Sequence, residues 1–180
     1  MSRLTAVLTA LAAALVAALG AASGASAQSS GGCQNAAAAA ADVPVRSVGS
    51  AVRCLVNLER ARHGLAPLQP SARLQSAATA HSSDMVARSF FAHVSPNGGT
   101  LTDRARRAGY SGRTLGEDIG WGTYDLGTPA AIVQAWMHSP PHRAVILSPK
   151  FREIGVGVAL GTPSGRTSTG AVYVLDLGRS

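Results

Sequence analysis

The stretch EIGVGVAL, residues 153–160, constrains the fold more than any other part of the sequence. Large apolar side chains alternate in it with glycine and alanine, which predicts a strand packed closely on both faces. The stretch TPSGR that follows is typical of a hairpin loop, and AVYVLDL, residues 171–177, returns as the last strand. The sequence therefore predicts an antiparallel hairpin near its C-terminal end.

The residues before this hairpin carry helical patterns, in which apolar side chains recur at spacings of three and four. These patterns predict four helices, over about residues 52–63, 72–88, 102–108 and 129–139. Residues 115–122 contain too many glycines for a helix and are expected to be irregular and partly extended. Residues 139–142, which read SPPH, are expected to form a rigid loop. Helices followed by an antiparallel hairpin indicate the α+β class, with helices covering a sheet.

The N-terminal segment has the parts of a secretory signal peptide. Arg3 gives a positive start, a run of Ala, Leu and Val follows, and a small-residue ASA site precedes the expected cleavage after Ala27. No second apolar span follows that would indicate a membrane anchor. A buried N-terminal helix and a lipid anchor at Cys33 are weaker alternatives. The predicted organisation is a signal peptide over 1–27, a flexible tether over 28–48 and one domain over 49–180.

The charge balance is basic, with 16 Lys and Arg against 9 Asp and Glu. Loss of Arg3 with the signal peptide leaves 15 basic residues, so the exported chain carries a net charge of +6. Such a charge favours anionic envelope polymers or lipid head groups as partners. Nucleic acid is not expected as a partner of a secreted protein.

The two cysteines, Cys33 and Cys54, are expected to form a disulfide, because export exposes the chain to an oxidising environment. Two free thiols are the alternative. A metal role is disfavoured, since neither cysteine has a CxxC or CxxH neighbour.

The sequence lacks HExxH, GxSxG and a Gly-rich loop ending in Gly-Lys-Ser/Thr. Their absence excludes the common zinc proteases, α/β-hydrolases and P-loop enzymes. Of the five histidines, His93 and His142 lie in expected loops and have no packing reason to be histidine. His81 is expected as a hydrogen-bonded core residue, His63 at a helix end and His138 on the surface.

Glu117, in the stretch LGEDI, lies among apolar residues and glycines, where a carboxylate tends to be half buried and to need a partner. Two histidines with a carboxylate nearby are the minimum for a metal site or for an acid–base pair. Two imidazoles would leave a zinc ion with open positions for water or a ligand. The alternative is that the three polar groups only hydrogen-bond to one another and tie the loops together.

Five blocks of the sequence, in this order, resemble the CAP superfamily of cysteine-rich secretory proteins, antigen 5 and pathogenesis-related plant proteins, in its bacterial SCP-like form. The blocks are NLERARHGLAPLQPSARLQSAATAHSSDM, FFAHVSPNGG, GEDIGWG, AWMHSPPHRAVIL and FREIGVGVA. The resemblance covers about residues 50–178. It implies a three-layer α-β-α sandwich around a small antiparallel sheet, with a cleft that holds two histidines and two acids.

By this resemblance, His93, Glu117 and His142 match three of the four site residues of the family. Family members can hold a divalent ion between the two histidines, so His93 and His142 are the candidate metal ligands and a weakly bound Zn²⁺ is the candidate cofactor. The sequence departs from the family in three places: Ser139 takes the position of the second acid, Asp118 stands where Asn is usual, and Pro141 replaces a glycine. A complete four-residue site is therefore not expected.

These features together predict a secreted, monomeric binding module whose cleft recognises a lipid, glycan or peptide at the cell envelope or outside the cell. The alternative is a metal-dependent protease or cell-wall hydrolase, in which His93, Glu117 and His142 would be catalytic and Glu117 would act on a metal-bound water. Binding is favoured over catalysis, because the chain lacks an evident nucleophile and the second acid. A structural domain of the envelope with an idle cleft is the third hypothesis.

Overall fold

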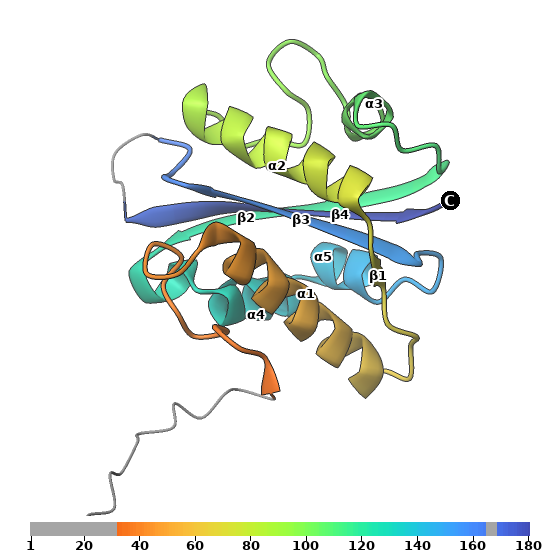
Figure 1. Ribbon diagram of the computed structural model, residues 1–180, viewed down its shortest axis with the longest axis horizontal. Helices are drawn as coiled ribbons and strands as arrows, with labels where there is room; N and C mark the ends of the chain where they lie inside the picture. The colour runs from red at the N-terminus through yellow and green to blue at the C-terminus, as the bar shows by residue number, and fades with distance from the viewer. Residues whose placement is uncertain (1–31, 165–168) are drawn as a thin grey trace, which may run out of the picture.

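The computed structural model describes residues 32–164 and 169–180, which form three layers (Figure 1). Helices α2 (Ala72–Ala87) and α3 (Leu101–Arg107) lie on one side of a sheet. Helices α1 (Val45–Arg62), α4 (Pro129–His138) and α5 (Pro140–Ile146) lie on the other side. The predicted α+β class and α-β-α layering are confirmed. Within the described ranges, no helix is long and apolar enough to cross a membrane.

The sheet has four strands in the order β1-β3-β4-β2. Strands β2 (Thr114–Thr123), β3 (Glu153–Leu160) and β4 (Gly170–Arg179) are antiparallel neighbours, and β3 with β4 is the predicted hairpin. The two-residue β1 (Gln69–Pro70) adds a parallel pairing to β3. Because β2 lies along the outer side of β4, it brings Glu117 opposite Asp176.

Strand β2 occupies the segment expected to be irregular over residues 115–122, so that expectation is wrong. Its glycines do not break the strand, because neighbouring side chains use the space they leave. A Cβ atom at Gly116 would lie 2.5 Å from the ring of Phe151, and one at Gly120 would lie 3.1 Å from Nε1 of Trp136. That indole N–H donates to the carbonyl of Ile119 at 3.0 Å, which fixes α4 against the strand.

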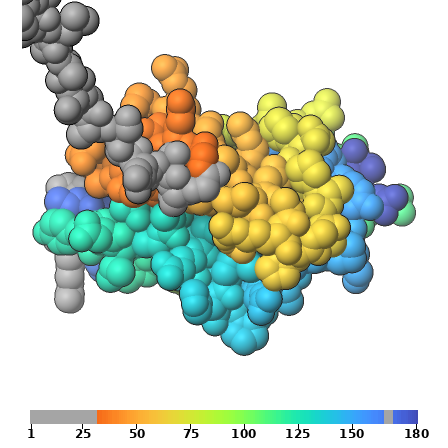
Figure 2. Space-filling model, turned by 90° about the horizontal axis from the view of Figure 1, so that it is seen from below, coloured from red at the N-terminus to blue at the C-terminus, as the bar shows by residue number. Residues whose placement is uncertain are grey.

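The two faces of the sheet are packed in different ways. On one face, large apolar side chains such as Val156 and Leu175 form the main core with α1, α4 and α5, which cover this face (Figure 2). On the other face, a Cβ atom at Gly155 or Gly157 would lie 2.1 Å from backbone atoms of α2. The alternation in β3 therefore has the predicted meaning: its large residues fill one interior and its glycines admit a helix backbone on the other face.

The N-terminal part of the described chain packs against the α1 side of the molecule. Cys33 and Cys54 form the predicted disulfide, and Ala36 and Ala40 are buried in the main core. Helix α1 begins at Val45, earlier than expected. The expected flexible tether over 28–48 is therefore wrong for residues 32–48, since the disulfide and small buried alanines hold this segment in place. The predicted signal peptide over 1–27 lies outside the described residues.

Candidate functional site

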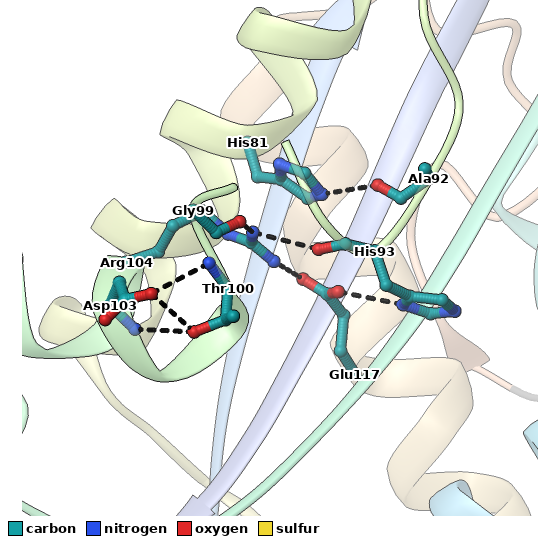
Figure 3. Close-up of polar contacts among 8 residues, drawn as sticks. All are labelled: His81, Ala92, His93, Gly99, Thr100, Asp103, Arg104 and Glu117. Carbon is teal, nitrogen blue, oxygen red and sulfur yellow. Dashed lines mark hydrogen bonds and ion pairs between the residues drawn. The ribbon is translucent and has the colours of Figure 1, made fainter. Parts of the chain in front are cut away.

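His93 lies in the loop between α2 and α3, as predicted. Ser89 starts this loop with a positive φ of 53°, and the side chain of Phe90 anchors it against a small apolar cluster. Farther along, the Ser95 N–H donates to the Gly99 carbonyl at 2.9 Å and closes a turn. The His93 side chain is 55% exposed and reaches Glu117 on β2 (Figure 3). The loop thus presents a half-exposed imidazole at the edge strand of the sheet.

Glu117 has both of its carboxylate oxygens engaged, although its side chain is only 3% exposed. Nδ1 of His93 donates to Oε1 at 2.9 Å, and Nη2 of Arg104 donates to Oε2 at 2.5 Å. The expectation that this acid is at least half buried and needs a partner is therefore confirmed. Its two partners come from the loop and from α3 (Figure 3).

Arg104 is a residue of the site that the sequence reasoning missed. Its Nη1 donates to the carbonyls of His93 at 3.0 Å and Gly99 at 3.1 Å, so the same guanidinium holds the loop and the carboxylate (Figure 3). Thr100 and Asp103 form a capping box that fixes the first turn of α3, from which Arg104 projects. Arg104 therefore positions both His93 and Glu117.

The His93–Glu117 contact changes the acidity of both groups. Burial alone would raise the pKa of Glu117, but the hydrogen bond from His93 and the charge of Arg104 outweigh it, and the pKa is lowered. The same hydrogen bond is the main reason that the pKa of His93 is raised. Each group favours the charged form of the other, so Glu117 is a carboxylate at neutral pH and His93 protonates more readily than a free imidazole.

His142 lies in the first turn of α5, not in the rigid loop expected over residues 139–142. Ser139 is the N-cap of this helix, and Pro140 and Pro141 occupy its first positions, where a missing N–H breaks no hydrogen bond. Nδ1 of His142 lies 2.8 Å from Oγ of Ser139. Burial lowers the pKa of His142, and the charge of His93 lowers it further. The structure therefore joins His93 and Glu117 by a hydrogen bond and brings His142 within electrostatic reach of His93, without a hydrogen bond between the histidines.

Each of the two imidazoles has the tautomer and orienting partner that suit a metal ligand. Nδ1 of His93 faces a carboxylate and Nδ1 of His142 faces a hydroxyl, so a tautomer protonated at Nδ1 leaves Nε2 of each ring for a ligand. Metal-binding histidines commonly donate their other N–H to such a group. Within residues 32–164 and 169–180, no three His, Cys, Asp or Glu side chains form a cluster that could hold a metal ion. Any ion here would have no third protein ligand of these types.

Two further buried carboxyls lie on β2 and β4. Asp118 is 1% exposed, and burial together with the charge of Glu117 raises its pKa to about 8. Asp176 is fully buried opposite Glu117, and burial and that same charge raise its pKa well above the usual range. Both acids are therefore mainly neutral at pH 7, and each has at least one oxygen without a hydrogen-bond partner among the described residues.

The remaining histidines lie where the sequence predicts them. His81 is buried and donates from Nε2 to the carbonyl of Ala92 at 3.0 Å, His63 follows the end of α1, and His138 is exposed at the end of α4. Signals for the missed residues were present. Arg104 shares a helical face with Ala105 and Ala108, and Asp176 interrupts an apolar strand. A charged residue at an apolar position indicates a buried partner.

The comparisons with known proteins identify the family and the fold. The sequence model of the Cysteine-rich secretory protein family (CAP) matches residues 54–176. The uncharacterized Bacillus subtilis protein YkwD is 44% identical over 103 residues, which cover 57% of this chain and 39% of YkwD. The uncharacterized B. subtilis membrane protein YlbC is 36% identical over 104 residues, which cover 58% of this chain and 29% of YlbC. The match thus spans well under half the length of either relative.

Three solved bacterial structures share the fold. An extracellular protein with an SCP domain from Bacillus anthracis superposes with a TM-score of 0.61 and 26% identity, over 77% of this chain and 44% of that one. An outer surface protein of Borrelia burgdorferi gives a TM-score of 0.66 and 18% identity, over 76% and 96% of the two chains. A cysteine-rich secretory protein of Staphylococcus aureus gives 0.54 and 20%, over 75% and 39%. The last two show the fold alone.

Proposed function

Because the chain belongs to the cysteine-rich secretory protein (CAP) family, we propose that it is an extracellular binding module whose site is formed by His93, Glu117 and His142. In this proposal the two imidazoles hold a divalent ion, with Zn²⁺ as the best candidate. The module then recognises a lipid, glycan or peptide at the cell envelope or outside the cell.

One observation carries the metal-binding part of the proposal: Nε2 of each imidazole has no hydrogen-bond partner among the described residues, while Nδ1 is oriented by an oxygen. Glu117 orients His93 and Ser139 orients His142. The lowered pKa of His142 keeps this ring neutral at physiological pH, as metal binding requires. The raised pKa of His93 makes a proton compete with the ion. A bound zinc ion would supply open coordination positions for an oxygen or nitrogen atom of the ligand.

Hydrolysis is the second candidate, and the state of Glu117 argues against it. A general base needs a free lone pair directed at the attacking water and a pKa near the working pH. Glu117 has both oxygens committed to His93 and Arg104, and its pKa is lowered rather than raised. Its main role in the proposal is to orient His93.

The extracellular location is supported by what similar proteins are called. The similar B. anthracis structure is an extracellular protein. The basic charge of this chain suits an anionic envelope. The signal peptide expected over 1–27, with cleavage after Ala27, would supply the export route.

A sedimentation assay with bacterial cell-wall sacculi and with phosphatidylglycerol vesicles tests this function. At 0.15 M salt, where long-range attraction to surface arginines is screened, the protein should pellet with one of them in the presence of zinc. Pelleting should fail with a chelator and in His142→Ala, and persist in His138→Ala, which removes an exposed histidine. Muropeptide or peptide fragments released in a zinc-dependent way would favour the hydrolase. Equal pelleting of wild type and His142→Ala would contradict the proposal.

A further inference from the structure

A polar cavity lies between α2 and α3, and the proposed function does not use it. Its volume is about 470 Å³, within the range of small-molecule sites. Arg88, Arg104 and Arg107 line it together with one carboxylate, Asp84. His93, Glu117 and His142 do not line it. Arg104, which pairs with Glu117, lines it with its guanidinium side chain.

The arginines of this cavity differ in their partners. Both oxygens of Asp84 pair with Arg88, and Arg104 pairs with Glu117. The side chain of Arg107 makes no hydrogen bond or salt bridge with any residue of the described ranges. Asp103, one turn earlier on α3, interacts with it electrostatically without contact, and it does not line the cavity. The cavity therefore holds one guanidinium whose charge is not already taken by a carboxylate in contact with it. A guanidinium presents several N–H donors in a fixed plane, which suits carboxylate and phosphate oxygens.

Asn97 adds a neutral donor to the lining. Its Oδ1 accepts the N–H of Gly99 at 3.2 Å, which leaves the side-chain NH₂ to donate elsewhere. Arg107 and Asn97 thus both offer side-chain N–H donors to the cavity. A cavity lined by three arginines and one carboxylate, with such donors free, favours an anion.

Two buried nitrogens of lining residues have no hydrogen-bond partner in the described part of the chain, Nδ1 of His81 and Nε of Arg104. His81 is fully buried and Arg104 is 5% exposed. Because Nε2 of His81 donates to the Ala92 carbonyl, Nδ1 of the neutral ring is an acceptor, while Nε of Arg104 is a donor. Buried polar atoms are rarely left without partners. A hydroxyl group can satisfy both kinds of atom, since it donates and accepts.

We propose that this cavity binds a small anion carried on a hydroxylated frame, either a polyol phosphate or a sugar acid. Arg107 and Asn97 bind the charged oxygens, and hydroxyl groups approach the His81 and Arg104 side of the cavity. Both ligand classes share the chemistry of anionic oxygens next to hydroxyls. This binding does not depend on a metal or on His142, so it can be tested independently of the proposed function.

Calorimetric titration with glycerol 3-phosphate and with glucuronate tests the proposal on the folded protein. At least one of the two should bind saturably with one site per chain, and which one binds identifies the source as phosphate or sugar acid. Arg107→Gln should weaken this binding at least tenfold. Arg106→Gln is the matched control: it removes the same charge from the neighbouring exposed position on α3, outside this cavity. It should change the affinity less than twofold.

Two results would overturn the proposal. One is the absence of saturable binding of both compounds by wild-type protein. The other is an equal loss of affinity in Arg107→Gln and Arg106→Gln, which would show diffuse attraction to a basic surface. Unfolding curves of both variants check that each is folded. His142→Ala should bind as wild type does, which separates this cavity from the histidines.

Discussion

Arg104 and Glu117 form an ion pair almost completely withdrawn from water, with 2.5 Å between Nη2 and Oε2 and side chains 4% and 3% exposed. The same guanidinium holds the carbonyls of His93 and Gly99. One side chain therefore joins α3, the loop that carries His93, and the edge strand β2. The desolvation of such a pair offsets much of its attraction, so its value lies in positioning, and the loss of one partner is what costs most.

Arg104→Leu should therefore be strongly destabilising, because it leaves Glu117 buried without its cation. We expect the free energy of unfolding in urea to fall by about 3–5 kcal/mol. Arg106→Leu, on an exposed position of the same helix, should change it by about 0.5 kcal/mol or less. The double variant Arg104→Leu/Glu117→Leu should lose less than the two single losses together. Equal effects of Arg104→Leu and Arg106→Leu would show that the pair holds nothing in place.

The His93–Glu117 contact predicts a pH dependence with a definite sign. The folded-state pKa of His93 is raised above its usual 6.5, so its contribution to stability is complete below that value and is lost as pH rises through the folded-state pKa. The gap in unfolding free energy between wild type and His93→Gln should be larger at pH 5.5 than at pH 9. In Glu117→Gln, an NMR titration should show a lower pKa for His93. A higher or unchanged pKa in that variant would exclude the hydrogen bond as its cause.

Asp118 should destabilise the protein at neutral pH. Its pKa is 3.8 in the unfolded chain and about 8 in the folded protein. The free energy of unfolding is therefore unaffected by Asp118 at low pH and decreases as pH rises between these two values. Keeping the carboxyl protonated at pH 7 costs up to about 4 kcal/mol. Asp118→Asn removes that cost, so the variant should unfold at a higher temperature than wild type at pH 7 and at a similar one at pH 4. Asp125→Asn, at an exposed position, is the control. A gain that does not grow with pH would contradict the burial of an acid here.

The surroundings of Gly157 and Gly49 predict opposite effects of a substitution by alanine. In Gly157→Ala the new Cβ would lie 2.1 Å from the backbone of Ala78, so α2 must move, and we expect a loss of about 3 kcal/mol or more. In Gly49→Ala, within α1, the nearest atom is the Val156 carbonyl oxygen at 3.5 Å, an ordinary contact. Helix propensity should then make this variant up to about 1 kcal/mol more stable. Thermal unfolding separates the two, and a tolerated Gly157→Ala would refute the packing of α2 on the sheet.

The hairpin of β3 and β4 could be predicted from sequence because its alternation reports burial on both faces. Strand β2 could not, since Gly116, Gly120 and Gly122 have no side chains to show a period. The space at Gly116 is used by Phe151 and the space at Gly120 by Trp136, and both of these residues lie later in the chain. Helix α5 was missed because prolines can mark either a loop or the start of a helix. Pro140 and Pro141 would interrupt the interior of a helix, but they are favourable in its first turn after the N-cap Ser139.

At the histidine site, the sequence identifies most of the residues but does not show which of them contact one another. His93 and Glu117 could be paired in advance through the family resemblance, and the structure places them 2.9 Å apart. Arg104 was missed because a charged residue on a short Arg-rich helix ordinarily faces water. Its burial accompanies its contacts with Glu117, His93 and Gly99, which the sequence of α3 alone does not reveal.

Zinc titration by calorimetry tests most directly whether His93 and His142 form a metal site. At pH 7.5 protons compete with zinc for His93 less than they do at lower pH. The wild-type protein should bind one ion per chain saturably. His93→Ala and His142→Ala should each abolish this binding, and His138→Ala, which removes an exposed histidine, should leave it unchanged. Absence of saturable binding by the wild type, or equal binding by all four proteins, would contradict a metal site between these two imidazoles.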